Sequence, residues 1–173
     1  MSSNENSDDK AKLDRKFGDH LEKYLTFIVD SEIYGLEILK VREIVAMLHI
    51  SKVPLVPDYV KGVINLRGKV IPVIDIRLKF KMEDIVYDEH TTIIIVDVDD
   101  ISVGFIVDET SEVVKIKQEN LMPPPKFGTT IDTSFLKSMA KMEDSITMII
   151  DLEELFSSDE IASLSMHNTE EEN

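Results

Sequence analysis

The sequence predicts a mostly β fold made from two copies of one unit. Ile and Val supply 37 residues and Ala only 4, and branched side chains favour pleated strands over helices. Residues 59–80 also recur at 135–156 with a constant offset of 76, so that Asp75 corresponds to Asp151. A repeated apolar pattern indicates a repeated structural unit. We therefore predict two small β-barrels, of about 60–70 residues each, packed together along an apolar seam.

Apolar runs bounded by polar turn residues predict the individual strands. Gly68 allows the positive φ that a tight hairpin turn requires, whereas the prolines at 123–125 exclude a central strand and predict a long loop over 118–134. Asp75 and Asp151 each follow a strand and precede a short helical pattern, which is typical of helix N-caps. The predicted strands are 23–30, 33–39, 43–48, 62–67, 69–74, 91–98, 101–107, 110–117, 136–142 and 146–150.

The two ends of the chain differ from its middle. The N-terminal stretch is polar and shows only a transient helical pattern, at 9–17. Near the other end, Ser157 followed three residues later by Glu160 is a capping-box pattern that predicts a helix start. The predicted divisions are a disordered tail at 1–19, a folded domain at 20–157 with barrel subdomains at about 22–85 and 90–157, and a C-terminal helix with a frayed tail at 158–173.

The composition excludes several classes of function. The formal net charge is −15 without a dense cluster of Lys and Arg, which disfavours binding to nucleic acid or to an anionic membrane surface. No apolar run approaches the length of a membrane span, and there is neither a secretory signal nor any cysteine. We therefore expect a cytoplasmic protein without direct membrane insertion.

Nothing in the sequence predicts catalysis, a metal or a cofactor. The histidines lack ligand spacings, no phosphate-binding glycine motif follows a strand, and no nucleophile is recognisably paired with a base. Residues 97–100 (DVDD) lack the glycine and the closing glutamate of a calcium loop and are predicted to form a solvated hairpin turn. We therefore expect a protein that is not an enzyme. The histidines are His20, His49, His90 and His167.

The two copies differ most at one hairpin and one neighbouring segment. Residues 65–68 read NLRG in the first copy, and their equivalents at 141–144 read KMED. The segment 39–47 mixes the apolar Val41 and Ile44 with charged residues. The equivalent segment of the second copy lacks this mixed face. Such a mixed face suits the docking of a partner helix. An edge strand guarded by charge is the alternative, with equal weight.

Arg67 is expected at the tip of the first hairpin. Its planar fork of donors suits a carboxylate on a partner, and a solvated arginine is the alternative. From the residues alone, a protein-binding module competes with a small-ligand-binding β-barrel, which would need an apolar pocket with convergent polar groups. An enzyme, the third possibility, would need a cluster such as His49 with acidic residues at one concave site.

Six motifs follow one another along residues 22–157, and GVINLRGKVIPVIDIR is the most specific part of them. In this order they resemble the CheW family of bacterial chemotaxis coupling proteins. No receiver or kinase segment is present, so the resemblance is to free-standing members. The motifs are KYLTF (23–27), IYGLEILKVREI (33–44), VPDYVKGVINLRGKVIPVIDIRLKF (56–80), VGFIVDETSEV (103–113), LMPPPKFG (121–128) and MIIDLEELF (148–156).

The resemblance implies a fold and a role. The fold is expected to be two intertwined five-stranded SH3-like barrels with short helices. The role is that of a non-enzymatic adaptor, monomeric in isolation, that bridges the cytoplasmic tips of chemoreceptors to the histidine kinase CheA in membrane-bound arrays. Motif by motif, with Ile44 added from the residue pattern, the expected receptor contacts are Val41, Glu43, Ile44, Gly62 and Arg67, and the expected kinase contacts are Phe127 and Met122.

The expected mechanism uses two surfaces at once. Val41 and Ile44 make apolar contacts with a receptor helix, while Glu43 and Arg67 pair with its charges. A second surface near Phe127 docks the kinase. Simultaneous engagement places receptor and kinase in a fixed geometry, so that receptor conformation biases kinase activity.

Overall fold

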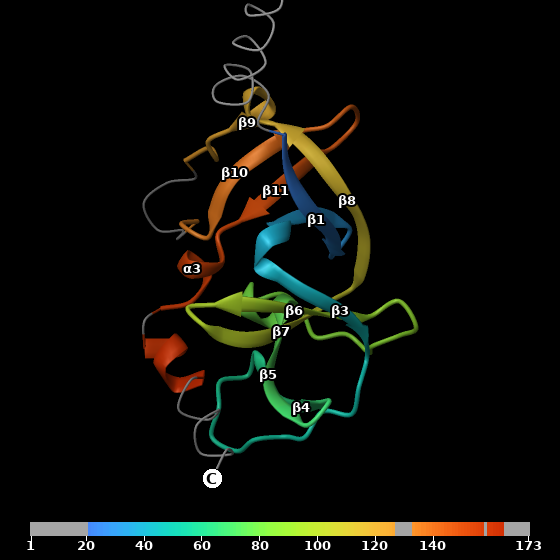
Figure 1. Ribbon diagram of the computed structural model, residues 1–173, viewed down its shortest axis with the longest axis vertical. Helices are drawn as coiled ribbons and strands as arrows, with labels where there is room; N and C mark the ends of the chain where they lie inside the picture. The colour runs from blue at the N-terminus through green and yellow to red at the C-terminus, as the bar shows by residue number, and fades with distance from the viewer. Residues whose placement is uncertain (1–20, 127–132, 158, 165–173) are drawn as a thin grey trace, which may run out of the picture.

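The computed structural model describes residues 21–126, 133–157 and 159–164, which form two packed β-sheets (Figure 1). All ten predicted strands are present, and the mostly β fold class is confirmed. The predicted tail at 1–19 lies outside the described residues. The strands are β1 (Leu21–Val29), β2 (Glu32–Glu37), β3 (Val41–Ala46), β4 (Val60–Leu66), β5 (Lys69–Asp75), β6 (Thr92–Val98), β7 (Ile101–Val107), β8 (Glu109–Lys117), β9 (Leu121–Met122), β10 (Leu136–Lys141) and β11 (Ile146–Ile150).

The two sheets exchange strands between the two sequence copies. Sheet A has the order β8-β1-β2-β11-β10-β9, and sheet B has the order β3-β6-β7-β5-β4. The first copy supplies β1 and β2 to sheet A but β3, β4 and β5 to sheet B; the second copy supplies β6 and β7 to sheet B but β8, β10 and β11 to sheet A. The barrels are therefore intertwined, and the sequence copies at about 22–85 and 90–157 each contribute to both sheets.

Strand β9 is the one element of sheet A that the sequence patterns missed. It has two residues, follows a single 3-10 turn η3 (Gln118–Asn120), and pairs with β10 at the edge of the sheet. A strand of two residues has no periodicity to detect. Part of the predicted loop at 118–134 is therefore a sheet edge, and sheet A has six strands where five were predicted.

The offset of 76 residues reappears in three dimensions. The β4–β5 hairpin leads into α2 (Ile76–Lys79), and the β10–β11 hairpin leads into α3 (Leu152–Leu155). Asp75 Oδ1 accepts a hydrogen bond from the first turn of α2 at 2.9 Å, and Asp151 Oδ1 accepts one from α3 at 3.1 Å. Both predicted N-caps are confirmed.

The described residues form three apolar clusters. They are separate because successive side chains along a strand point to opposite faces of the sheet. Phe27 of sheet A and Ile94 and Val96 of sheet B belong to the largest cluster, which we call the seam core because it lies between the sheets. Ile93 and Ile95, on the opposite face of β6, belong to a second cluster inside sheet B. A third, smaller cluster lies inside sheet A. The predicted apolar seam is confirmed, and side chains fill the interior of each barrel.

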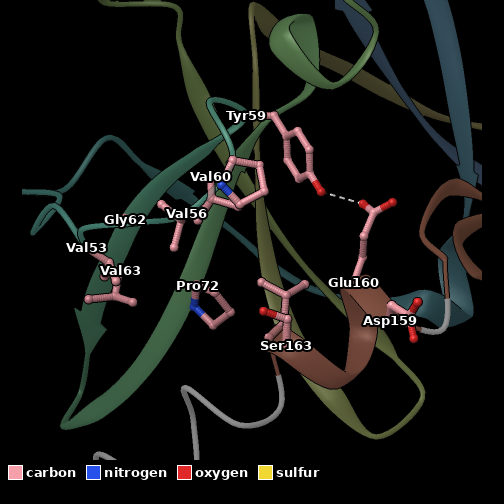
Figure 2. A pocket seen from close by; sticks show the side chains of 12 residues that line it. Val53, Val56, Tyr59, Val60, Gly62, Val63, Pro72, Asp159, Glu160 and Ser163 are labelled. Atoms are coloured by element: carbon pink, nitrogen blue, oxygen red, sulfur yellow. Dashed lines mark hydrogen bonds between the residues drawn. The ribbon is translucent and has the colours of Figure 1, made fainter.

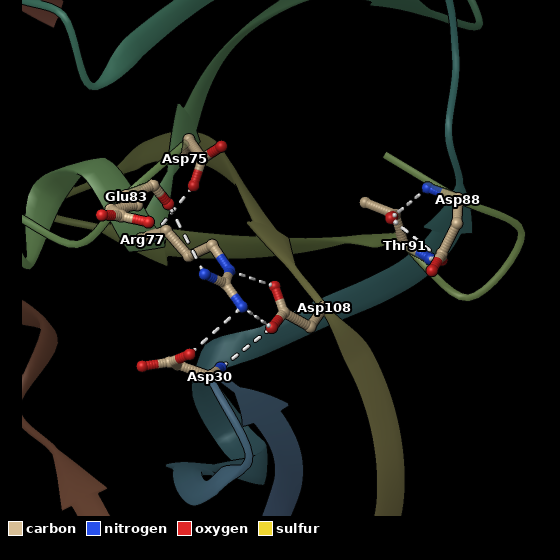
Figure 3. Close-up of polar contacts among 7 residues, drawn as sticks. All are labelled: Asp30, Asp75, Arg77, Glu83, Asp88, Thr91 and Asp108. Atoms are coloured by element: carbon tan, nitrogen blue, oxygen red, sulfur yellow. Dashed lines mark hydrogen bonds and ion pairs between the residues drawn. The ribbon is translucent and has the colours of Figure 1, made fainter. Parts of the chain in front are cut away.

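The chain crosses between the sheets at two equivalent places, and each crossover carries an ion pair. Between β7 and β8, Asp108 accepts two hydrogen bonds from Arg77, at 2.8 Å from Nε and 2.7 Å from Nη2 (Figure 3). Between β2 and β3, in the 3-10 turn η2 (Ile38–Lys40), Lys40 pairs with Glu153 at 2.6 Å. Arg77 and Glu153 are equivalent at the offset of 76. At this position of the repeat, the first copy therefore supplies the cation of the ion pair, and the second copy supplies the anion.

The two ion pairs differ in burial. The side chains of Arg77 and Asp108 are 12% and 22% exposed, whereas those of Lys40 and Glu153 are 40% and 41% exposed. The backbone N–H of Asp30 also donates to Asp108 at 2.9 Å. Burial opposes ionisation of Asp108, but the hydrogen bonds from Arg77 and Asp30 outweigh it and hold the pKa of Asp108 below its ordinary value.

Residues 159–164 are the described part of the C-terminal helix. Ser157 Oγ accepts a hydrogen bond from the backbone N–H of Glu160 at 3.1 Å, which confirms the predicted N-cap. Leu164 is buried in the seam core, and Ile161 packs against it. The helix is therefore held against the body of the protein from its capped end to Leu164.

Candidate functional site: the β3 edge and the β4–β5 hairpin

The β4–β5 hairpin ends in a two-residue turn at Arg67 and Gly68. Their φ angles are 53° and 86°, the left-handed pair that suits a tight turn between the paired residues Leu66 and Lys69. The N–H of Gly68 donates to Asn65 Oδ1 at 2.8 Å. Arg67 is therefore fixed at the tip of the hairpin, with 71% of its side chain exposed.

Glu43 and Arg67 form an ion pair between the two edges of sheet B. Strand β3 is one edge and β4 is the other, and Glu43 Oε1 accepts a hydrogen bond from Arg67 Nη2. A pair with 32% and 71% of its side chains exposed contributes about 0–1 kcal/mol to stability. Its main effect is to hold a carboxylate and a guanidinium side by side at the surface. The structure thus brings these two predicted residues together.

Strand β3 places Val41 and Ile44 in different environments. The register with β6 slips between Val41 and Glu43, which marks a β-bulge. Val41 packs against the seam core, whereas Ile44 is 44% exposed. The structure therefore does not bring Val41 and Ile44 together as one apolar surface, and of the two only Ile44 has a substantially exposed side chain.

Gly62 is buried beneath the segment that precedes β4. Its φ is 143°, and a Cβ at this position would lie 2.0 Å from the carbonyl oxygen of Ser51. Ser51 and Val63 exchange backbone hydrogen bonds of 2.8 and 2.9 Å, which pin this segment to β4. Because Gly62 has no Cβ, the backbone at Ser51 can lie directly against β4 and hold the hairpin in place.

Of the two predicted kinase-contact residues, only Met122 lies among the described residues; Phe127 lies outside them. Met122 is 43% exposed and faces Met139 across β9 and β10, and Met139 in turn faces Met148 on β11. Three methionines thus form a row that runs inward from the edge of sheet A, across β9, β10 and β11. Thioether side chains adapt to irregular partner surfaces. The sequence did not reveal this row because it depends on β9.

A chain of polar contacts beside the hairpin was also missed. Arg42 Nε donates to Asp97 Oδ2 at 2.7 Å, Ser102 Oγ donates to Asp97 Oδ1 at 3.3 Å, and Lys69 Nζ donates to Ser102 Oγ at 3.1 Å. These contacts link β3 to β5 across β6 and β7. The turn predicted at 97–100 is present, but Asp97 is a partner in this network. Arg42 is 55 positions from Asp97 and Lys69 is 33 positions from Ser102, so a local pattern could not show these two contacts.

Among residues 21–126, 133–157 and 159–164, no three His, Asp or Glu side chains gather in a way that could hold a metal ion. Within the same residues, no helix combines the length and hydrophobicity needed to cross a membrane. The features that this region does offer are surfaces: an exposed ion pair at one sheet edge, and a methionine row that runs inward from the edge of the other sheet.

Comparison with known proteins gives a consistent answer. The chemotaxis protein CheW of Klebsiella aerogenes is 36% identical over 141 residues, covering 82% of this chain and 85% of the relative. CheW of Helicobacter pylori is 35% identical, covering 79% and 82% of the two chains. The crystal structure of the scaffolding protein TtCheW from Thermoanaerobacter tengcongensis is 40% identical, with a TM-score of 0.74 over 80% of this chain and 94% of that one.

The profile of the CheW-like domain matches residues 23–160. This range begins in β1 and ends in the C-terminal helix, so it includes both sheets and the hairpin that carries Arg67. On the strength of this match and of relatives covered over 85% and 94% of their own length, the chain belongs to the CheW family.

Proposed function

We propose that this protein is a chemotaxis adaptor that couples chemoreceptors to the histidine kinase CheA. The observation that carries the proposal is the family match over residues 23–160, joined to relatives named as chemotaxis CheW proteins and to a solved neighbour described as a scaffolding protein. An adaptor needs separate surfaces rather than reacting groups, and the β3 edge and the β9 edge belong to different sheets. Recruitment to membrane-bound receptor arrays is part of this proposal.

The receptor site is proposed at the exposed ion pair. Glu43 and Arg67 offer adjacent opposite charges, and Ile44 offers an apolar side chain on the same strand as Glu43. A receptor helix with a complementary pair of charges can dock here. Val41 and Gly62 contribute by supporting β3 and β4 from within, because Val41 packs on the seam core and Gly62 is buried beneath Ser51.

The kinase site is proposed at the far edge of sheet A. Met122 is exposed there, and β9 is the outermost strand of sheet A among the described residues, so a partner could add to this edge. Phe127 follows in the same segment of sequence and is proposed as a second contact. Because the two sites lie on different sheets, one molecule can engage both partners together.

The adaptor role includes the absence of catalysis and of a cofactor. The alternative of a small-ligand-binding β-barrel is not favoured by the relatives, and the two smaller apolar clusters fill the barrel interiors where such a ligand would lie.

Co-sedimentation with receptor-containing membranes, with and without CheA, tests the proposal. Wild-type protein is expected to sediment with receptors and to increase the amount of kinase that sediments. Arg67→Glu should reduce receptor binding about tenfold or more, because it places a second carboxylate beside Glu43. Circular dichroism and melting should stay near those of the wild type, because the pair contributes little to folding.

Lys115→Glu is the matched control, since it makes the same charge change at an exposed site on β8 of sheet A. It should leave receptor binding unchanged. Equal losses from the two variants would show that net charge, rather than the hairpin, governs binding. Wild-type protein that fails to sediment with receptors would refute the adaptor proposal itself.

A further inference from the structure

An apolar pocket of about 210 Å³ lies on the outside of sheet B (Figure 2). One wall is the loop at 53–57 with strands β4 and β5, and the other is the helix at 159–164. The pocket is separate from the ion pair at Arg67 and from the methionine row. Its apolar lining includes Val53, Val56, Val60, Val63, Pro72 and Leu164.

The helix side of the pocket is acidic. Glu160 Oε2 accepts hydrogen bonds from Tyr59 at 2.5 Å and from Lys79 at 2.7 Å, so its charge is offset within the protein (Figure 2 shows the Tyr59 contact). Asp159 is exposed and has no ion-pair partner among the described residues. A ligand that enters from this side therefore meets apolar walls and one free carboxylate, which favours an apolar group next to a cation.

Both walls are held in place without a ligand. The N–H of Val60 donates to the carbonyl of Pro57 at 3.0 Å, which fixes the end of the loop. The helix is capped by Ser157 and anchored by Leu164 in the seam core. The same loop holds Leu55 fully exposed with a φ of 64°, a conformation that leucine rarely adopts. The pocket is thus preformed and has an exposed apolar side chain in the loop that forms one wall.

The volume of the pocket indicates the size of its occupant. Pockets for drug-sized ligands span about 300–1,000 Å³, and each water takes about 30 Å³. A space of about 210 Å³ is therefore small for a free cofactor and large enough for one bulky side chain of a peptide. Replacing loosely held water with an apolar group in such a site is favourable.

One segment of this chain has the required chemistry. Residues 10–17 (KAKLDRKF) carry four cations and one carboxylate, a net charge of +3 in a protein whose net charge is −15. Leu13 and Phe17 are four residues apart and would share one face of a helix. Residues 165–173, which follow the pocket helix directly, contain three glutamates and no Lys or Arg. They do not complement an acidic rim.

Phe17 cannot reach the pocket of its own molecule. Phe17 is four residues from Leu21 and so lies within about 14 Å of it. Strand β1 alone is about 27 Å long. Strands β4 and β5 and the helix at 159–164, which line the pocket, lie toward the opposite end of the long axis from the start of β1 (Figure 1). A second copy of the chain would have to supply the segment.

We propose that this pocket binds residues 10–17 of a second copy of this chain, with Phe17 as the apolar anchor and the neighbouring cations facing Asp159. The contact joins unlike surfaces of the two molecules, so it is heterologous and can extend from copy to copy. It goes beyond the adaptor function and does not depend on it.

A synthetic peptide of residues 10–18 titrated into the full-length protein tests the proposal. Saturable binding is expected by calorimetry, with NMR shifts in the methyl groups of Val60 and Val63 and weaker binding at high salt. A Phe17→Ala peptide should bind at least about tenfold more weakly, because it loses the buried aromatic group. In sedimentation velocity, wild-type protein should self-associate with increasing concentration, and the full-length Phe17→Ala variant should do so less.

Two protein variants localise the binding. Asp159→Lys should weaken peptide binding, and Glu154→Lys, the same charge change on α3 away from the pocket, should not. Ser163→Phe should fill the mouth of the pocket and weaken binding independently of charge. Equal effects of the two lysine variants, methyl shifts elsewhere, or a full-length protein that stays monomeric would overturn the proposal. A further pair of results would also overturn it: no binding of the peptide to the wild-type protein, together with a loss of receptor or kinase co-sedimentation in the Ser163→Phe variant. The pocket would then bind the receptor or the kinase rather than a second copy of this chain.

Discussion

Replacing Arg77 with alanine should destabilise the protein substantially without touching either proposed partner site. Arg77 makes a two-pronged hydrogen bond to Asp108 at 2.8 and 2.7 Å and a further ion pair with Asp30 at 3.6 Å. Removing it leaves Asp108, which is 22% exposed, as a largely buried carboxylate that keeps the hydrogen bond from the Asp30 N–H but loses its ion pair. Hydrogen bonds to charged groups contribute about 1.5–3 kcal/mol, and breaking a buried pair costs about 3–5 kcal/mol.

From these contacts we expect a loss of about 3 kcal/mol in the free energy of unfolding. For a chain of 173 residues this corresponds to a fall of about 6–12 °C in Tm. Urea denaturation followed by circular dichroism measures the free energy directly, and a thermal melt gives the shift in Tm.

The second crossover supplies a matched comparison within the same molecule. Glu153→Ala removes the equivalent ion pair with Lys40, whose side chains are 40% and 41% exposed. An exposed pair of this kind contributes about 0–1 kcal/mol. Glu153→Ala should therefore cost much less than Arg77→Ala, although both residues occupy the same position of the repeat.

The difference between wild type and Arg77→Ala should also depend on pH. The pKa of Asp108 is lowered in the folded protein by Arg77 and the Asp30 N–H acting against burial. A lowered folded-state pKa contributes stability above the unfolded value, about pH 4, and that contribution is lost as the pH falls through the folded value. The gap between the two proteins should therefore narrow below about pH 4. Two results would refute the conclusion that Arg77 and Asp108 form a buried, stabilising ion pair. One is an equal loss of unfolding free energy in the Arg77 and Glu153 variants. The other is a stability difference between wild type and Arg77→Ala that grows as the pH falls.

Four further substitutions test particular elements. Gly62→Ala should cost at least about 2 kcal/mol, visible as a lower urea midpoint, because φ is 143° and the new Cβ meets the Ser51 carbonyl. Asp151→Ala should cost about 1 kcal/mol through the loss of the α3 cap, with partner binding unchanged; an unaltered melt would count against the cap. Ile44→Asp should weaken receptor co-sedimentation while Tm stays within a few degrees, since its side chain is exposed. Phe127→Ala should weaken CheA binding alone, and a matching loss of receptor binding would contradict two separate surfaces.

Part of the site was predictable from sequence because its signals are local. Gly68 at a turn between two apolar runs indicates a hairpin wherever it occurs, and Arg67 beside it is then at the tip. The caps at Asp75 and Asp151 are also local, since each carboxylate bonds to a backbone group two residues away. The difference between the NLRG and KMED copies drew attention to the hairpin that the structure places against Glu43.

Other features depend on residues that are far apart in sequence. Nothing near Val41 shows that it packs on the seam core while Ile44 is exposed, because a bulge against β6 decides this. Gly62 was expected as a contact residue, and its burial arises from a backbone carbonyl eleven positions earlier, at Ser51. The methionine row follows from the pairing of β9 with β10 and of β10 with β11.

The amino-acid pattern by itself determined the strands other than β9, their turns and the helix caps, because each of these depends on neighbours within a few residues. The duplication was also visible, because two stretches of the sequence can be compared directly. The family resemblance implied intertwined barrels. Only the tertiary structure decided which strands the two copies exchange, that Arg77 and Asp108 pair inside the protein at one crossover, and that Lys40 and Glu153 pair at its surface at the other. The reason is physical. Exchanged and unexchanged barrels would use the same apolar residues in the same order. What distinguishes them is the long-range pairing of β2 with β11 and of β5 with β7, which joins the two copies within each sheet.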